Sequence, residues 1–249
     1  MLNRMEYEFI KIIEKDNAVE LVLNRPNSLN ALSTPMLKEI RSALSYINSL
    51  PQNIIVLRGE GRTFCVGGDV KEIKGGVSFN TYFERVSTLQ EIASLLRETE
   101  KIIIAVLHGH VVGGGMIMSL YADIRIAAEG TVFRLPEIDV GSTVLCGGHK
   151  ILLDNIGSAK TREFLFLGES LSVDDAEELN LINKKVPSDK LGDALQGYID
   201  KFSSKPSKTL KVIKMALRQA SDGKFGDMLN LEAVDALRNF HYRLEQGKD

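Results

Sequence analysis

The sequence has no tryptophan, only two cysteines and little imbalance of charge. Cys65 and Cys146 stand far apart without a paired-cysteine spacing, which argues against a disulfide framework and against a cysteine-based zinc site. We therefore expect a protein of a reducing compartment, with no bound metal ion. The 31 Lys and Arg residues nearly balance the 33 Asp and Glu residues, and the net charge is -2. Such a charge gives no long-range attraction to nucleic acid or to an anionic membrane.

A long uninterrupted apolar run is also lacking. The longest apolar tract, residues 102–120, contains His108, His110 and four glycines, and it divides into a strand-like half and a helix-like half. This pattern indicates buried core and not a membrane span. Residues 1–13 mix charged with apolar side chains, which is not the pattern of an export signal. We expect a cytoplasmic protein whose partners include neither a membrane nor a nucleic acid.

The chain is long and apolar enough to bury a substantial core. Its 249 residues with 44% hydrophobic content suit one large domain with a smaller appendage. A helix is predicted from Thr34 as N-cap and Pro35 at the first helical position, and it ends before Pro51. Short apolar and β-branched runs predict strands at 8–13, 18–23, 53–57 and 102–107.

Beyond Gly141 the apolar periodicity is helical. A helix over 158–167 would be closed by Gly168, and the capping-box pair Ser172 and Asp175 would open another over 172–179. Three more helices are predicted over 188–202, 207–220 and 229–244. Strands first and helices last predict an α/β core over residues 1–190 and a helical C-terminal region over residues 191–249.

Two glycine-rich loops follow predicted strands. One is Phe64-Cys65-Val66-Gly67-Gly68-Asp69, and the other runs from His108 to Gly115 and leads into a helix predicted to begin near Met116. Successive glycines let the backbone approach a ligand closely and leave N–H groups free to donate. Donors near a helix start favour a developing oxyanion. Either loop alone is weak evidence of a ligand site, since a glycine-rich turn is more often only a tight turn.

Taken together and in order, these loops resemble the crotonase (enoyl-CoA hydratase/isomerase) superfamily. The match runs from about Glu8 to Lys214 and includes three further kinds of segment, namely Leu23-Asn24-Arg25-Pro26 with Asn30-Ala31-Leu32, residues 122–127 and residues 133–141. The resemblance implies an α/β fold in which a spiral of ββα turns forms the core. It also implies a C-terminal helical region that builds trimers, which usually pair into hexamers.

The resemblance further implies a site for an acyl-CoA. Two backbone N–H groups, those of Cys65 and Gly114 by motif position, would form an oxyanion hole around the thioester carbonyl. Residues 75–88 would line the acyl pocket. Lys71 or Lys74 would lie near a phosphate, unless these lysines belong to a solvated helix face. Coenzyme A would be part of the substrate, so no separate cofactor is expected. The residues expected to contact the ligand are Cys65, Gly67, Gly68, Asp69, Val70 and Gly114.

Hydratases of this superfamily usually carry two glutamates, and this chain matches only one of them. Glu137 stands in the expected Pro-Glu pair, whereas Ile117 occupies the place of the other glutamate. Hydration needs a base for the water and an acid for the α-carbon, and isoleucine can be neither. One carboxylate can still move a proton between two carbons of an enolate, and an apolar pocket would raise its pKa. We therefore expect enolate chemistry with Glu137 as the single catalytic glutamate, above all isomerisation of an enoyl-CoA double bond.

Other interpretations stay open. Residues 109–118 and Phe240-His241 also resemble crotonases that decarboxylate glutaconyl thioesters with the help of a C-terminal histidine. Carboxymethylproline synthases similarly keep the Pro-Glu pair and lack the other glutamate. A non-catalytic acyl-CoA-binding subunit, or an RNA-binding member of the superfamily, is a further class, and the near-neutral charge counts against RNA. His149 opens a predicted helix and is expected to cap or pack there.

Overall fold

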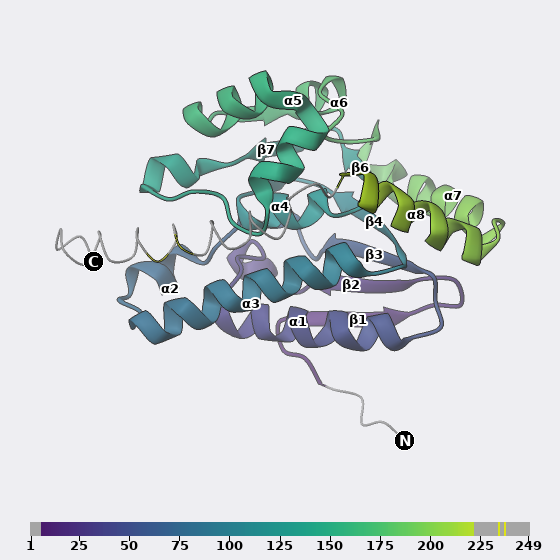
Figure 1. The fold of residues 1–249 in the computed structure, drawn as a ribbon, viewed down its shortest axis with the longest axis horizontal. Coiled ribbons are helices and arrows are strands. Elements are labelled where there is room, and N and C mark those ends of the chain that lie inside the picture. The colour runs from purple at the N-terminus through teal and green to yellow at the C-terminus, as the bar shows by residue number, and fades with distance from the viewer. Residues whose placement is uncertain (1–5, 222–233, 235–236, 238–249) are drawn as a thin grey trace.

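Two β-sheets form the centre of the molecule (Figure 1). The computed structural model describes residues 6–221 together with Val234 and Leu237. The first sheet has six strands in the order β1 (Ile10–Glu14), β2 (Val19–Leu23), β3 (Ile54–Gly59), β4 (Ile102–Leu107), β6 (Ile124–Ala128) and β9 (Lys184–Val186). Only β1 and β2 pair antiparallel in it; the other neighbours are parallel. The second sheet consists of β5 (His110–Val112), β7 (Val132–Arg134) and β8 (Ser170–Ser172).

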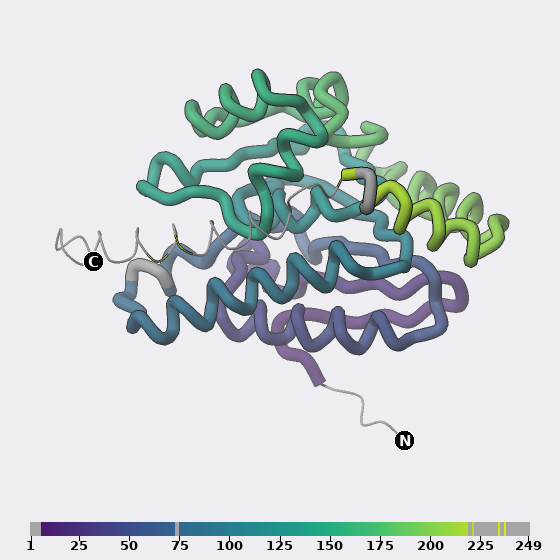
Figure 2. Tube along the Cα trace, viewed as in Figure 1, coloured from purple at the N-terminus to yellow at the C-terminus, as the bar shows by residue number. Residues whose placement is uncertain are grey.

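The helices connect and cover these sheets, as the path of the chain in Figure 2 shows. Within residues 6–221, the α-helices are α1 (Thr34–Ser49), α2 (Val70–Lys74), α3 (Phe79–Glu98), α4 (Gly114–Leu120), α5 (Gly148–Leu167), α6 (Val173–Glu178), α7 (Leu191–Ser203) and α8 (Ser207–Ser221). The short 3-10 helices are η1 (Pro26–Ser28), η2 (Pro136–Val140) and η3 (Ser188–Lys190). The repeated passage from strand to helix produces the spiral that the sequence predicts.

Strand β4 shows why the large sheet needs helices on both faces. Its side chains alternate between two hydrophobic clusters, because successive residues of a strand point to opposite faces. Ile103 and Leu107 join the larger cluster with α1 and α3, whereas Ile102 and Ile104 join a smaller cluster with α7. A parallel sheet buried on both faces reads as a continuous apolar run, which is how residues 102–107 were recognised as a strand.

Several predicted elements need correction. The N-cap of α1 is Ser33 and not Thr34, because the Ser33 side chain accepts the Met36 N–H. Helix α5 is kinked at Gly157, whose φ of 71° and ψ of 173° are not helical; its second half therefore begins at the predicted residue 158 and is closed by the predicted Gly168, and its first half begins at Gly148, beside the predicted His149. The 20-residue helix α3 was not predicted at all. The predicted helix over 229–244 lies outside the described residues.

Other predictions are confirmed. The capping box of Ser172 and Asp175 is present in full and opens α6 at Val173. Strand β4 has the predicted bounds, and α8 starts at the predicted Ser207. The division into residues 1–190 and 191–249 stays a prediction.

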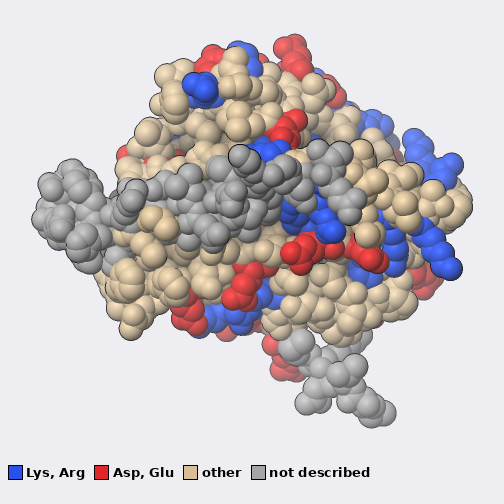
Figure 3. Space-filling view, viewed as in Figure 1, with Lys and Arg blue, Asp and Glu red and all other residues tan. Residues whose placement is uncertain are grey.

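The surface of the described residues is mixed in character. Acidic and basic side chains lie near one another over the face drawn in Figure 3. On α8, Val212 and Leu217 are 64% and 68% exposed, which is unusual for large apolar side chains. Within residues 6–221, 234 and 237, no helix has the length and apolar character needed to cross a membrane.

Candidate active site

The two glycine-rich loops lie side by side. Cys65 forms an isolated parallel bridge with Val111 of β5, in which the Cys65 N–H donates to His110 O at 3.1 Å and the Val112 N–H donates to Cys65 O at 2.9 Å. A β-carbon on Gly67 would stand only 3.0 Å from Val112 O. Gly67 also has φ 83°, a conformation that other residues rarely adopt. Glycine at this position therefore lets the first loop lie directly against the second.

Cys65 belongs to this packing and does not face a ligand. Its thiol donates to Asn30 O at 3.1 Å, and a β-carbon on Gly115 would stand 2.6 Å from Cys65 Sγ. Burial raises the pKa of the Cys65 thiol to about 12. Because the Cys65 N–H already donates to His110 O, the expectation that Cys65 supplies an oxyanion-hole donor needs correction.

The neighbouring Gly68 has the backbone orientation expected of Cys65. The Leu32 N–H donates to Gly67 O at 2.8 Å. Since the C=O and N–H of a trans peptide point in opposite directions, the Gly68 N–H points away from Leu32. Gly68 is partly exposed, whereas Cys65 and Gly67 are buried. Within this loop, Gly68 and not Cys65 therefore has the N–H that is left for a ligand.

Gly114, the other expected donor, is the first residue of α4. The carbonyl that precedes it, Gly113 O, accepts the Ile117 N–H at 3.0 Å inside the helix, so the Gly114 N–H points out of the helix start. Gly114 is partly exposed between the buried Gly113 and Gly115. A β-carbon on Gly67 would stand 3.5 Å from Gly114 N, so the loop that carries Gly68 borders this N–H.

Glu137 stands in the first turn of η2, next to the glycine triad. The Gly113 N–H donates to Arg134 O of β7 at 2.9 Å, which ties the triad to the strand leading into η2. A β-carbon on Gly113 would stand 3.0 Å from Glu137 Oε1. The other carboxylate oxygen, Oε2, is buried without a hydrogen-bond partner. Burial raises the pKa of Glu137 to about 7, in the predicted direction and for the predicted reason.

Ile117 fills the position where a second glutamate was expected in a hydratase. It is 1% exposed and lies one turn into α4. A β-carbon on Gly148 would stand 2.9 Å from Ile117 Cδ1 and 3.2 Å from Val144 Cβ. The wall of the site at this point is therefore apolar and closely packed.

The expected CoA-binding residues Asp69 and Val70 begin α2. Asp69 is its N-cap and accepts N–H groups from Lys71 and Glu72, while its Oδ2 accepts Arg25 Nη1 at 3.0 Å. Burial alone would raise the pKa of Asp69, but the hydrogen bond and charge of Arg25 together with the N–H groups of Glu72 and Lys71 outweigh burial and lower the pKa. The Asp69 carboxylate thus holds the loop in place. Val70 is exposed beside it.

The histidines of the sequence analysis have different outcomes. His149 stands in the first turn of α5, and its Nε2 lies 3.0 Å from Thr143 Oγ1 in the loop before the helix. This contact fits the packing role expected of His149. His241 lies outside the described residues. The proposed decarboxylase role of His241 therefore stays a prediction.

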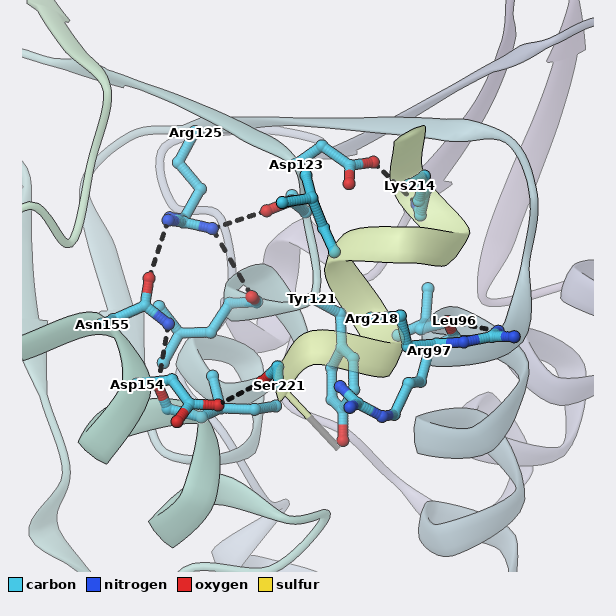
Figure 4. A pocket seen from close by; sticks show the side chains of 14 residues that line it. Leu96, Arg97, Tyr121, Asp123, Arg125, Asp154, Asn155, Lys214, Arg218 and Ser221 are labelled. Atoms are coloured by element: carbon cyan, nitrogen blue, oxygen red, sulfur yellow. Dashed lines mark hydrogen bonds and ion pairs between the residues drawn. The ribbon is translucent and has the colours of Figure 1, made fainter. Parts of the chain in front are cut away.

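A pocket of about 330 Å³ lies elsewhere, between α3, α4, α5 and α8 (Figure 4). Two of its cations are bonded within the lining: Lys214 Nζ donates to Asp123 Oδ2 at 2.7 Å, and Arg125 Nη2 donates to Asn155 Oδ1 at 3.0 Å. Lys214 also donates to Lys101 O, which fastens α8 to the large sheet. These contacts explain how α8 docks, and Glu137 and the glycine loops are not part of this pocket.

No group of three or more His, Cys, Asp or Glu side chains within the described residues could hold a metal ion. Glu137 lies against Gly113, and the loop that carries Gly68 borders the Gly114 N–H. A carboxylate of nearly neutral pKa is suited to removing a proton from a carbon next to a carbonyl, and backbone N–H donors can stabilise the enolate that results.

Comparisons with known proteins identify the family of this chain. The family model described as enoyl-CoA hydratase/isomerase matches residues 14–242. A Dictyostelium discoideum protein named "Probable enoyl-CoA hydratase, mitochondrial" is 34% identical over 206 residues, which are 82% of this chain and 73% of that protein. The short-chain-enoyl-CoA hydratase of Clostridium acetobutylicum is 29% identical over 220 residues, 84% of this chain and 80% of that one.

A solved structure shows the same fold. The enoyl-CoA hydratase of Mycobacterium avium subsp. paratuberculosis superimposes with a TM-score of 0.87 at 20% identity, over 95% of each chain. The fold, the ordered motifs and the family match converge, and the chain belongs to the enoyl-CoA hydratase/isomerase family.

Proposed function

We propose that this protein isomerises the double bond of an enoyl-CoA through a thioester enolate, with Glu137 as the only proton carrier. The observation that supports this proposal most strongly is the Glu137 carboxylate itself. One of its oxygens is buried without a partner, its pKa is raised to about 7, and it lies against Gly113 at the start of α4. Such a carboxylate can act as a base near neutral pH, and little water has to be removed from it when a substrate binds.

The oxyanion hole in this proposal consists of the N–H groups of Gly68 and Gly114. Both residues are partly exposed, and both N–H groups point away from the hydrogen bonds that hold their loops. They would donate to the thioester oxygen as negative charge develops on it. Removal of one donor from such a hole typically costs ~10²–10³ in rate.

The proton transfers balance with one carboxylate. Glu137 takes a proton from C2 of a 3-enoyl thioester, and the electrons of that C–H bond delocalise onto the thioester oxygen and C4. The protonated Glu137 then returns the proton to C4, which leaves the double bond between C2 and C3. The proton that leaves C2 is the one that returns to C4, so the scheme needs no other reactant. Coenzyme A is part of the substrate and not a separate cofactor.

Hydration is the second candidate, because the relatives reported above carry the name hydratase. Ile117 counts against it. An isoleucine packed against Val144 and the Gly148 position offers neither a base nor a hydrogen-bond partner for a water molecule. Decarboxylation of a glutaconyl thioester and ligand binding without turnover remain alternatives that the same assay separates.

We propose a trimer or a dimer of trimers as the assembly. The apolar side chains of Val212, Ile213 and Leu217 are exposed along α8, and burial between subunits would remove them from water. A cytoplasmic location fits the two buried cysteines, Cys65 and Cys146, which form no disulfide with each other.

The reaction is identified by incubating the purified protein with 2-enoyl-, 3-enoyl- and glutaconyl-CoA and following the products by mass and chromatography. The proposal predicts conversion of the 3-enoyl thioester at constant mass. A mass gain of one water from the 2-enoyl thioester would establish hydration instead. Loss of carbon dioxide from glutaconyl-CoA would establish decarboxylation, and binding without any product would leave a non-catalytic subunit.

A further inference from the structure

Arg85 is a buried cation that none of the proposed chemical steps uses. It stands on α3 and is only 7% exposed. Its Nη2 donates to Leu32 O at 2.7 Å, and its Nη1 lies 3.5 Å from Thr34 Oγ1 and 3.8 Å from Glu72 Oε2. The free energy cost of burying a guanidinium is high unless its hydrogen bonds are specific, so these contacts identify what Arg85 holds.

The carbonyl that Arg85 holds belongs to the residue that orients the first glycine loop. Leu32 O accepts both Arg85 Nη2 and the Asp69 N–H, the latter at 3.1 Å, and the Leu32 N–H donates to Gly67 O. The two peptides on either side of Gly68 are thus both fastened to Leu32. A hydrogen bond from a charged donor is stronger than one from a neutral donor, so Arg85 is the firmest support of this carbonyl.

A second contact, made from α2, reinforces the segment that contains Leu32. Glu72 Oε2 accepts the Thr34 N–H at 2.8 Å while it faces Arg85. Burial lowers the pKa of Arg85, and the charge of Glu72 opposes that shift. Residues 32–34, the end of the first glycine loop and α3 are therefore joined through one guanidinium.

We propose that Arg85 is a positioning residue for the acyl thioester: through the Leu32 carbonyl, it fixes the direction of the Gly68 N–H relative to the Gly114 N–H. This inference rests on the proposed function, because it assumes that these two N–H groups bind the thioester oxygen. Arg85 touches no substrate in this account. Its substitution would misalign a donor without deleting it.

The experiment compares Arg85→Met and Arg85→Lys with the unchanged protein. Isotope-edited infrared spectra of a ¹³C-carbonyl acyl-CoA report how strongly the bound thioester is polarised, and kinetics report kcat and KM separately. We expect Arg85→Met to lower kcat by about tenfold, a part of the ~10²–10³ that loss of a donor costs. We expect its carbonyl band to shift back toward the value of free ligand, with CoA affinity changed less than about twofold. Arg85→Lys keeps the charge but not the paired N–H donors of the guanidinium, so its kcat and carbonyl band should lie between those of Arg85→Met and the unchanged protein.

Glu91→Gln is the matched control. Glu91 lies on α3 outside residues 75–88 and pairs with Arg41 at 3.1 Å on the surface. A general weakening of α3 would affect this variant as well, whereas the proposal expects its carbonyl band and kcat to remain unchanged. If both Arg85 variants fail to fold, Glu72→Gln perturbs the same unit from its more exposed side and should shift the band in the same direction, with a fall in kcat of about threefold.

The outcomes separate this inference from the function on which it rests. An unchanged protein that neither turns over nor shifts the carbonyl band would contradict the proposed function. If the unchanged protein is active and a folded Arg85→Met variant keeps its carbonyl band and its kcat, the positioning role is overturned and the proposed function stands. The same conclusion follows from a folded Glu72→Gln variant that keeps both values, in the case where neither Arg85 variant folds.

Discussion

Glu137 Oε1 lies 3.0 Å from the point where a β-carbon on Gly113 would stand. The Glu137 carboxylate therefore packs against the backbone of Gly113, where any side chain would clash with it. The Gly113 backbone has φ 54° and ψ -131°, a conformation that suits glycine. This contact connects a glycine of the sequence motif to the carboxylate that we propose as the proton carrier.

Gly113→Ala should displace the Glu137 carboxylate and lower turnover by about tenfold or more, since small displacements of a catalytic group are costly. Part of any effect will come from backbone strain at positive φ. Gly130→Ala controls for strain, because Gly130 has φ 75° but a β-carbon there would meet nothing within 4 Å. Equal kinetic losses in the two variants would show that the contact with Glu137 does not matter.

The raised pKa of Glu137 predicts how stability depends on pH. The carboxyl has a pKa of about 7 in the folded protein against 4.5 ordinarily, so the unfolded chain releases its proton first as pH rises. Stability should therefore fall between these two values and change no further from this source above them. Glu137→Gln removes this titration. Between pH 4 and pH 8, the free energy of unfolding of the variant should therefore rise relative to that of the unchanged protein by up to about 3 kcal/mol. Denaturant unfolding at both pH values measures the difference, and a pH-independent difference would contradict the shift.

The role of the Gly114 N–H can be tested without breaking α4. Proline is tolerated at the first helical position, so Gly114→Pro should preserve the helix while deleting the donor, at a cost of ~10²-fold or more in kcat. Gly114→Ala introduces a β-carbon and keeps the N–H; the side chain it meets is Leu32 Cδ1 at 3.3 Å. If the proline and alanine variants were equally active, the N–H would have no catalytic role.

The exposed apolar face of α8 predicts self-association. Light scattering of the purified protein should give at least the mass of a trimer, and Val212→Glu should dissociate it, because a charge would have to be buried in the interface. Lys208→Glu alters the charge of the same helix at an exposed polar position and should leave the mass unchanged. A monodisperse monomer at micromolar concentration would contradict the proposed assembly.

Residues close in the sequence were easier to predict than those brought together by folding. The capping box at Ser172 and the strand over 102–107 depend on local patterns, and both are confirmed. The free N–H in the first glycine loop depends on Leu32, more than thirty residues earlier, which is why the motif alone indicated Cys65 in place of Gly68. Helix α3 was missed because its buried side includes Arg85 and Thr88, which weaken the apolar period.

The most direct test of the account is the turnover of Glu137→Gln on a 3-enoyl-CoA. The substitution keeps the shape of the side chain and removes the base, so kcat should fall by ~10²–10⁴-fold while the affinity for CoA ligands changes little. Asp139→Asn is the matched control, since Asp139 stands in the same short helix η2 and pairs with Arg134 on the surface at 2.7 Å. Loss of turnover in Glu137→Gln alone is the predicted result; full isomerase turnover in Glu137→Gln would contradict the account.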